Sequence, residues 1–460
     1  MKITSRLAHA IIFSLLLTLL NVPVNASSIL PKEPRVGDRC EKDPKVPAAW
    51  KKYQDFTWNY PACPHPYRYA SGKLSSKKPK TAQSDRSELL SVDQCMIANY
   101  FGSQRAKQAR GEILGPNYTI QFVTFQTPDY KVKSNPQKDY KDWVKAMKDV
   151  MNKSSDLPFN FKIVVPDKYF MLSNDLKNYG VGSKSGGNTG NFLKLAQDAV
   201  AVADGEINFA GANTVWFVGP PNSKKKDLSG IALYNQNVVT QEKTFPKTLV
   251  TTHPYNYDLK NRQKSGNEWD GSGALGFMHE WGHSSGTFTV LASVFGGPQE
   301  TEGSMQWGVM QSKDGDWLAL HKWILQMISD DQIRCASKSK VTTHWLKPST
   351  IKGGYEKLLM VPLSSTEYLA VESIRPYGYS FKIPKCQQGA LVYVASRYGG
   401  GWDERTIHIP STKKKKKCPG HNISSTGALV NGDSVSYGGV KITVVEAGVF
   451  GDVVRVETGA

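Results

Sequence analysis

The chain has 460 residues, of which 39% are hydrophobic, 21% charged and 10% aromatic. This composition excludes a largely disordered, collagen-like or coiled-coil protein, and the length provides two to three domains with a sizeable core. The formal net charge of +18 favours acidic surfaces, so anionic cell-surface polymers are expected partners. The lysine runs lack the interleaved aromatic residues of a nucleic-acid groove, so no specific nucleic acid is expected.

The first 26 residues are typical of a secretory signal peptide. Lys2 and Arg6 precede an apolar run from Ala10 to Leu20, and small residues ending at Ala26 offer a cleavage site. No later stretch approaches the ~20 apolar residues that a membrane span requires. We therefore expect a secreted protein, extracellular or periplasmic, with no transmembrane segment after removal of the signal.

Residues 27–111 form an extension rich in Pro, Lys and Ser, which we interpret as a cysteine-containing module or a propeptide. Export makes disulfides the expected state of the cysteines. Three cysteines precede residue 100 and three follow residue 330, so at least one bridge joins the N-terminal and C-terminal regions if all are paired. The connectivity stays open. The six are Cys40, Cys63, Cys95, Cys335, Cys386 and Cys418.

Strand and helix patterns alternate after residue 112. Alternating apolar and polar residues predict a strand, apolar residues at helical spacing predict a helix, and β-branched or aromatic runs predict further strands. The alternation indicates an α/β layer. The expected elements are strands at 118–125, 159–165 and 214–218 and helices at 140–151 and 192–203.

Two more helices are expected before the pattern changes. The first carries an apolar face formed by Ala274, Phe277, Met278 and Trp281, and the second spans 316–328. Beyond Asp331 short strands separated by turns predict a β-rich, sandwich-like domain over 332–460. These strands are expected at 367–372, 390–395, 434–437, 440–445 and 452–457.

One motif, His279-Glu280-Trp281-Gly282-His283, is specific enough to indicate a function. Residues four apart share one face of a helix, so both imidazoles can bind one zinc ion while Glu280 approaches a metal-bound water. Glu280 would then act as general base and later protonate the leaving amine. The sequence therefore predicts a secreted zinc-dependent endopeptidase that hydrolyses protein or peptide substrates.

The residues after the motif carry a family resemblance. The motif continues to Gly286, which resembles the metzincin pattern in which a glycine permits a turn to a third ligand three residues later. That position is Thr289, a poor zinc ligand, so the third ligand must come from elsewhere. Residues 302–325 are similar to the immune inhibitor A-type metallopeptidases, in which a segment running from Glu through Trp to a Met-turn precedes a helix and a β domain.

The resemblance is strongest over 274–325 and implies a fold and a ligand set. It implies an α+β protein with a zincin-like α/β catalytic domain at 112–331 and an all-β, sandwich-like domain at 332–460. It also implies that Met310 is the Met-turn residue and that Glu302 completes the zinc site with His279 and His283. Glu300 is the nearby competitor for the third position.

Two other functions remain open. Gly282-His-Ser284-Ser-Gly286 fits the nucleophile elbow of a serine hydrolase, which would use Ser284. The chain is also compatible with a non-catalytic, basic, secreted protein that binds surfaces. Separately, Asn117, Asn152 and Asn422 begin glycosylation sequons, which matter only in a host that glycosylates secreted proteins.

Overall fold

The computed structural model of the chain describes sixteen continuous segments. It contains helices and sheets, and more of its elements are strands than helices. In the described part, no helix is long and apolar enough to cross a membrane. The described residues are 88–96, 117–182, 191–224, 226–229, 231–233, 236–246, 248–251, 281–282, 309, 316–353, 356–375, 380, 388–396, 406–408, 428–448 and 451–459.

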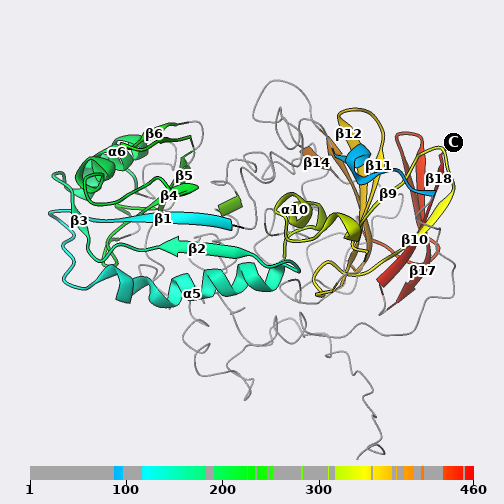
Figure 1. The fold of residues 1–460 in the computed structure, drawn as a ribbon, viewed down its shortest axis with the longest axis horizontal. Coiled ribbons are helices and arrows are strands. Elements are labelled where there is room, and N and C mark those ends of the chain that lie inside the picture. Colours follow the sequence, from blue (N-terminus) through cyan, green and yellow to red (C-terminus); the bar gives the residue numbers. More distant parts are fainter. Residues whose placement is uncertain are drawn as a thin grey trace, which may run out of the picture.

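A mainly parallel sheet forms one side of the molecule (Figure 1). Its strand order is β2-β1-β4-β8-β5, and β3 pairs with the far end of β1. The neighbours from β2 to β8 are parallel, whereas β5 is antiparallel to β8 and ends the sheet in the described part. The bounds are β1 (Asn117–Gln126), β2 (Asn160–Val164), β3 (Phe170–Met171), β4 (Thr214–Val218), β5 (Ile231–Leu233) and β8 (Thr248–Thr251).

Two helices cover opposite faces of this sheet, α5 (Pro136–Ser154) and α6 (Phe192–Ala203). Alternate residues of a strand face opposite sides. Accordingly, Phe122 of β1 belongs to the core that contains the α5 residues, whereas Val123 belongs to the core that contains those of α6. Beside α6 lie the 3-10 helix η4 (Leu176–Tyr179) and the hairpin of β6 (Val238–Val239) and β7 (Thr244–Phe245).

The predicted strands and helices of this layer are confirmed, and the start of α5 has a local cause. The Asn135 side chain accepts hydrogen bonds from the first N–H groups of α5, and Pro136 fits the first turn because that position needs no N–H partner. These two residues start the helix four residues earlier than the apolar spacing predicts. The bounds of α6 and β4 match their predicted ranges.

The C-terminal part contains two sheets that share one hydrophobic core, as the predicted strands suggest. One has the order β14-β13-β12-β11-β9 with β15 paired to β13, and the other the order β10-β18-β17-β16. The first comprises β9 (Ile333–Cys335), β11 (Leu358–Pro362), β12 (Glu367–Ile374), β13 (Gly389–Ser396), β14 (Thr406–His408) and β15 (Ala428–Leu429). The second comprises β10 (Thr342–Leu346), β16 (Ser434–Tyr437), β17 (Val440–Gly448) and β18 (Gly451–Thr458).

The prediction of a helix over 316–328 is wrong in its length, because α10 spans only Ala319–Ile324. Its start is fixed from a distance, since the buried Glu372 carboxylate accepts the Ala319 N–H at 2.9 Å. Its end is fixed by Gln326, whose φ of 57° is left-handed and cannot continue a right-handed helix. The 3-10 helix η7 (Asp330–Gln332) follows and leads into β9.

α10 lies between the parallel sheet and the C-terminal sheets (Figure 1). One continuous hydrophobic core contains Phe122 of β1, Trp323 and Ile324 of α10 and Tyr393 of β13. The two parts of the chain are therefore joined by buried apolar surface, which is the largest favourable term in folding.

A disulfide attaches the N-terminal extension to the C-terminal sheet. Cys95 ends the 3-10 helix η3 (Val92–Cys95), drawn in blue in Figure 1, and bonds to Cys335 of β9. The Leu90 N–H also donates to the Cys335 carbonyl at 2.9 Å. This bridge joins the N-terminal and C-terminal regions as the cysteine distribution predicts. The other four cysteines lie outside the described residues.

We expect the double substitution Cys95→Ala and Cys335→Ala to lower the free energy of unfolding by about 2–4 kcal/mol. The bridge closes a loop with a sequence separation of 240 residues, and losing it enlarges the conformational freedom of the unfolded chain. Denaturant unfolding of the two proteins measures the difference. Reduced wild type serves as the control, and equal midpoints for oxidised wild type and the double variant would contradict the expectation.

Candidate functional site

The structure describes only the centre of the predicted metal-binding motif. Trp281 and Gly282 are helical and buried, which confirms that Trp281 belongs to a buried helix face. The predicted ligands and base, His279, Glu280, His283 and Glu302, lie outside the described residues. So do Ser284, Gly286, Thr289, Glu300 and Met310, and therefore none of these positions is placed relative to another.

Trp281 packs into a group of aromatic rings under the start of the parallel sheet. Its ring lies edge-on to Tyr118 of β1 at 5.2 Å between centroids and to Phe161 of β2 at 5.6 Å. Phe159 and Trp317 make similar edge contacts at 6.2 and 5.9 Å. Edge-to-face geometry is favourable for aromatic pairs, so the four contacts fix the position of this helical turn against the sheet.

The Tyr118 hydroxyl is buried within this aromatic group. Burial raises the pKa of the Tyr118 hydroxyl, and a hydrogen bond with the Trp281 side chain opposes part of the rise. Tyr118 is therefore neutral at ordinary pH and fully enclosed. We assign it a packing role, because a group that never ionises and never meets solvent cannot exchange protons with a substrate.

The segment after the motif is anchored by a buried ion pair. Lys322 of α10 donates to the Asp316 carboxylate at 2.7 Å and to the Ser349 carbonyl at 3.0 Å. The Asp316 carbonyl accepts the Val309 N–H at 3.0 Å. Since Lys322 and Asp316 are only 1% and 3% exposed, removing either partner would leave a buried charge uncompensated. The apolar spacing that predicts this helix gives no signal for the pair.

Glu372 of β12 lies beside this ion pair and is fully buried. Its Oε1 accepts the Ala319 N–H and the Tyr393 hydroxyl, both at 2.9 Å, and its Oε2 accepts the Ser349 hydroxyl at 3.3 Å. Burial raises the pKa of Glu372 from 4.5 to about 7, although these hydrogen bonds and the Lys322 charge favour the carboxylate. Desolvation therefore outweighs the favourable contacts.

This raised pKa predicts a pH-dependent stability. Between pH 4.5 and 7 the folded state binds more protons at Glu372 than the unfolded state does, so its stabilising contribution is present at low pH and is lost as the pH rises through 7. We expect wild type to lose about 2 kcal/mol relative to Glu372→Gln between pH 5 and pH 7.5. Urea unfolding across this range measures it, and parallel pH profiles would contradict it.

The described histidines that are buried do not resemble metal ligands. Burial lowers the pKa of His321 to about 3 and that of His344 to about 4. His321 packs against Trp317, with 6.1 Å between ring centroids, and His344 hydrogen-bonds to Thr342 at 2.8 Å. Within the described ranges, no group of three or more His, Cys, Asp or Glu side chains is arranged to hold a metal ion.

Neither a scan of protein-family models nor a search among curated proteins finds a match to this chain. The assignment of a function therefore depends on the motif and on the described surroundings of Trp281.

Proposed function

We propose that the chain is a secreted zinc-dependent endopeptidase in which His279 and His283 bind the metal and Glu280 is the general base. The observation that carries the proposal is the spacing of these three residues around Trp281, whose backbone is helical and whose ring is buried. Trp281 is the central residue of this sequence, and its helical backbone and buried ring are what a zinc-binding helix held by its apolar face requires.

Helical geometry connects the burial of Trp281 to the expected metal site. Successive residues of an α-helix are rotated by about 100°, so residues two apart face nearly opposite directions. If the helical turn at Trp281 extends over 279–283, we expect both histidines on the side away from the aromatic group. Such a helix would be held by its apolar face and would present its imidazoles at the opposite surface.

The donor types fit zinc. Two imidazoles with one carboxylate form a ligand set found in zinc peptidases, and Glu302 is our proposed third ligand. When bound, zinc lowers the pKa of a coordinated water towards ~7 and polarises the scissile carbonyl. Glu280 accepts the proton of the attacking water and transfers it to the amine that leaves, so one carboxyl group serves both steps.

The parallel sheet offers an edge for an extended substrate. β5 is antiparallel to β8 and is the last strand of the sheet in the described part. A strand at an edge presents backbone N–H and C=O groups with which a peptide can pair. We propose that this layer is zincin-like and that the two C-terminal sheets form a sandwich, because their facing residues share one core.

The test is zinc content and casein hydrolysis by the purified mature protein, with and without a chelator. We expect about one zinc per chain, cleavage that stops on chelation and resumes on zinc addition, and loss of both metal and cleavage in His283→Ala. Absence of zinc and cleavage would overturn the proposal in favour of a surface-binding protein. Cleavage that resists chelators and is blocked by a serine-directed phosphonate would favour the hydrolase that uses Ser284.

A pair of variants identifies the third ligand. We expect Glu302→Gln to weaken zinc binding by at least about tenfold, because an amide is a poorer ligand than a carboxylate. Glu300→Gln, two residues away, is the matched control and should bind zinc as wild type does. Competition with a fluorescent chelator measures both affinities, and the reverse ranking would assign the ligand to Glu300.

A further inference from the structure

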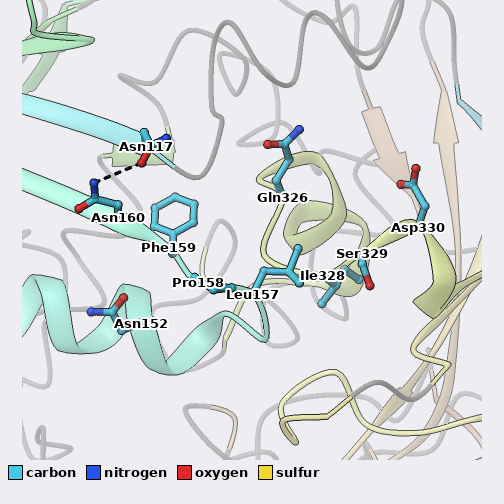
Figure 2. A pocket seen from close by; sticks show the side chains of 10 residues that line it. All are labelled: Asn117, Asn152, Leu157, Pro158, Phe159, Asn160, Gln326, Ile328, Ser329 and Asp330. Atoms are coloured by element: carbon cyan, nitrogen blue, oxygen red, sulfur yellow. Dashed lines mark hydrogen bonds between the residues drawn. The ribbon is translucent and has the colours of Figure 1, made fainter.

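A cavity of about 910 Å³ opens between the start of the parallel sheet and the turn after α10 (Figure 2). Four carboxamide side chains line it: Asn117 of β1, Asn160 of β2, Asn152 of α5 and Gln326. Leu157, Phe159 and Ile328 add apolar surface. The volume lies in the range of about 300–1,000 Å³ that small-molecule sites occupy.

The walls of this cavity are held in place from both sides. The Met327 carbonyl, in the turn after α10, accepts the Asp156 N–H at 2.8 Å and the Leu157 N–H at 3.2 Å. Asp156 also forms a buried ion pair with Lys357 and accepts the Gln332 side chain at 2.7 Å. These bonds join the loop after α5 to the turn after α10, so the cavity is formed before any ligand arrives.

Gln326 occupies a backbone position that normally belongs to glycine. Its φ is 57°, its N–H donates to the Trp323 carbonyl, and the next N–H donates to the Lys322 carbonyl. This pair of bonds defines a Schellman turn, in which the left-handed residue is usually glycine because a Cβ costs free energy there. A glutamine at this position raises the free energy of the turn relative to glycine, which suggests that the Gln326 side chain has a function.

The lining chemistry selects a neutral ligand rich in hydroxyl groups. Each carboxamide offers two donors and one acceptor. Asn160 donates one N–H to the Asn117 oxygen at 3.2 Å (Figure 2), and within the described part the carboxamides of Asn152 and Gln326 make no hydrogen bond. No described lining residue is cationic, and the one carboxylate, Asp330, already accepts the Trp323 indole N–H at 2.8 Å. We propose that this cavity binds a neutral saccharide through its carboxamides, with the apolar floor against the C–H face of a sugar ring.

The test is binding of maltotriose, cellotriose and N-acetylchitotriose to the mature chain, with a capped trialanine peptide as the contrasting probe. The protein is made in a host that adds no N-glycans, since Asn117 and Asn152 begin sequons. Saturation-transfer NMR followed by titration calorimetry should show binding of at least one saccharide, unchanged by a chelator. No saccharide binding at 10 mM, or binding of the peptide alone, would overturn the proposal.

Substitutions of the lining residues test whether the saccharide binds in this cavity. We expect Gln326→Gly to weaken saccharide binding by about three- to tenfold, the effect of one lost hydrogen bond, without lowering the melting temperature, because glycine suits the left-handed turn. Asn160→Ala should also weaken binding, whereas Asn178→Ala, at an exposed position of η4, should not. Wild-type affinity in both cavity variants would overturn the assignment. Insensitivity to chelators separates this result from the proposed peptidase function.

Discussion

Glu280→Ala is expected to retain about one zinc ion per chain while casein hydrolysis falls by about 10²- to 10⁴-fold, the range that general acid–base catalysis contributes. In the proposed mechanism the two histidines bind metal and Glu280 only transfers protons. This variant should therefore keep its zinc while its rate of casein hydrolysis falls, whereas His283→Ala should lose both the zinc and the hydrolysis. Metal analysis and a casein assay on the same preparation measure both quantities.

Glu206→Ala is the matched control for Glu280→Ala. Glu206 is a surface residue whose side chain is 54% exposed and pairs with Lys168, and exposed pairs contribute only about 0–1 kcal/mol. This variant should keep both zinc and activity. If Glu280→Ala loses zinc as His283→Ala does, Glu280 holds the metal or its site together, and its assignment as general base is wrong.

The elements predicted well from sequence are those with a local apolar pattern, either a continuous run or a helical spacing. α6 and β4 match their predicted bounds because every residue of β4 is buried and the apolar residues of α6 follow the helical spacing. α10 could not be bounded in this way, since its start depends on Glu372, which is 53 residues distant. The sequence does not predict the short strands β5, β8 and β9, because three or four residues are too few to show a period.

For the candidate site, sequence predicts residue types and spacing but not the surroundings. The motif is visible because the metal chemistry requires residues close together in the chain. The aromatic contacts of Trp281 come from β1, β2 and the approach to α10, with Tyr118 lying 163 positions before it in sequence. No local pattern reports such contacts, and neither the Lys322–Asp316 pair nor the left-handed Gln326 has a sequence signature.

Trp281→Ala should lower the free energy of unfolding by about 3–5 kcal/mol, as truncation of a buried tryptophan does. Its ring is 1% exposed and contacts four other aromatic rings, so the substitution leaves a cavity and removes the edge-to-face contacts. Trp281→Phe retains part of the contact and should cost less. Urea unfolding of wild type and both variants gives the three values.

The same variants connect packing to the proposed metal site. If the aromatic group fixes the helix that carries the motif, Trp281→Ala should also weaken zinc binding, and Trp281→Phe should restore most of it. Trp345→Ala is the control, because Trp345 lies in β10, is only half-buried and is covered by Lys347. A destabilised Trp281→Ala that binds zinc with wild-type affinity would show that the metal ligands are positioned independently of this aromatic group.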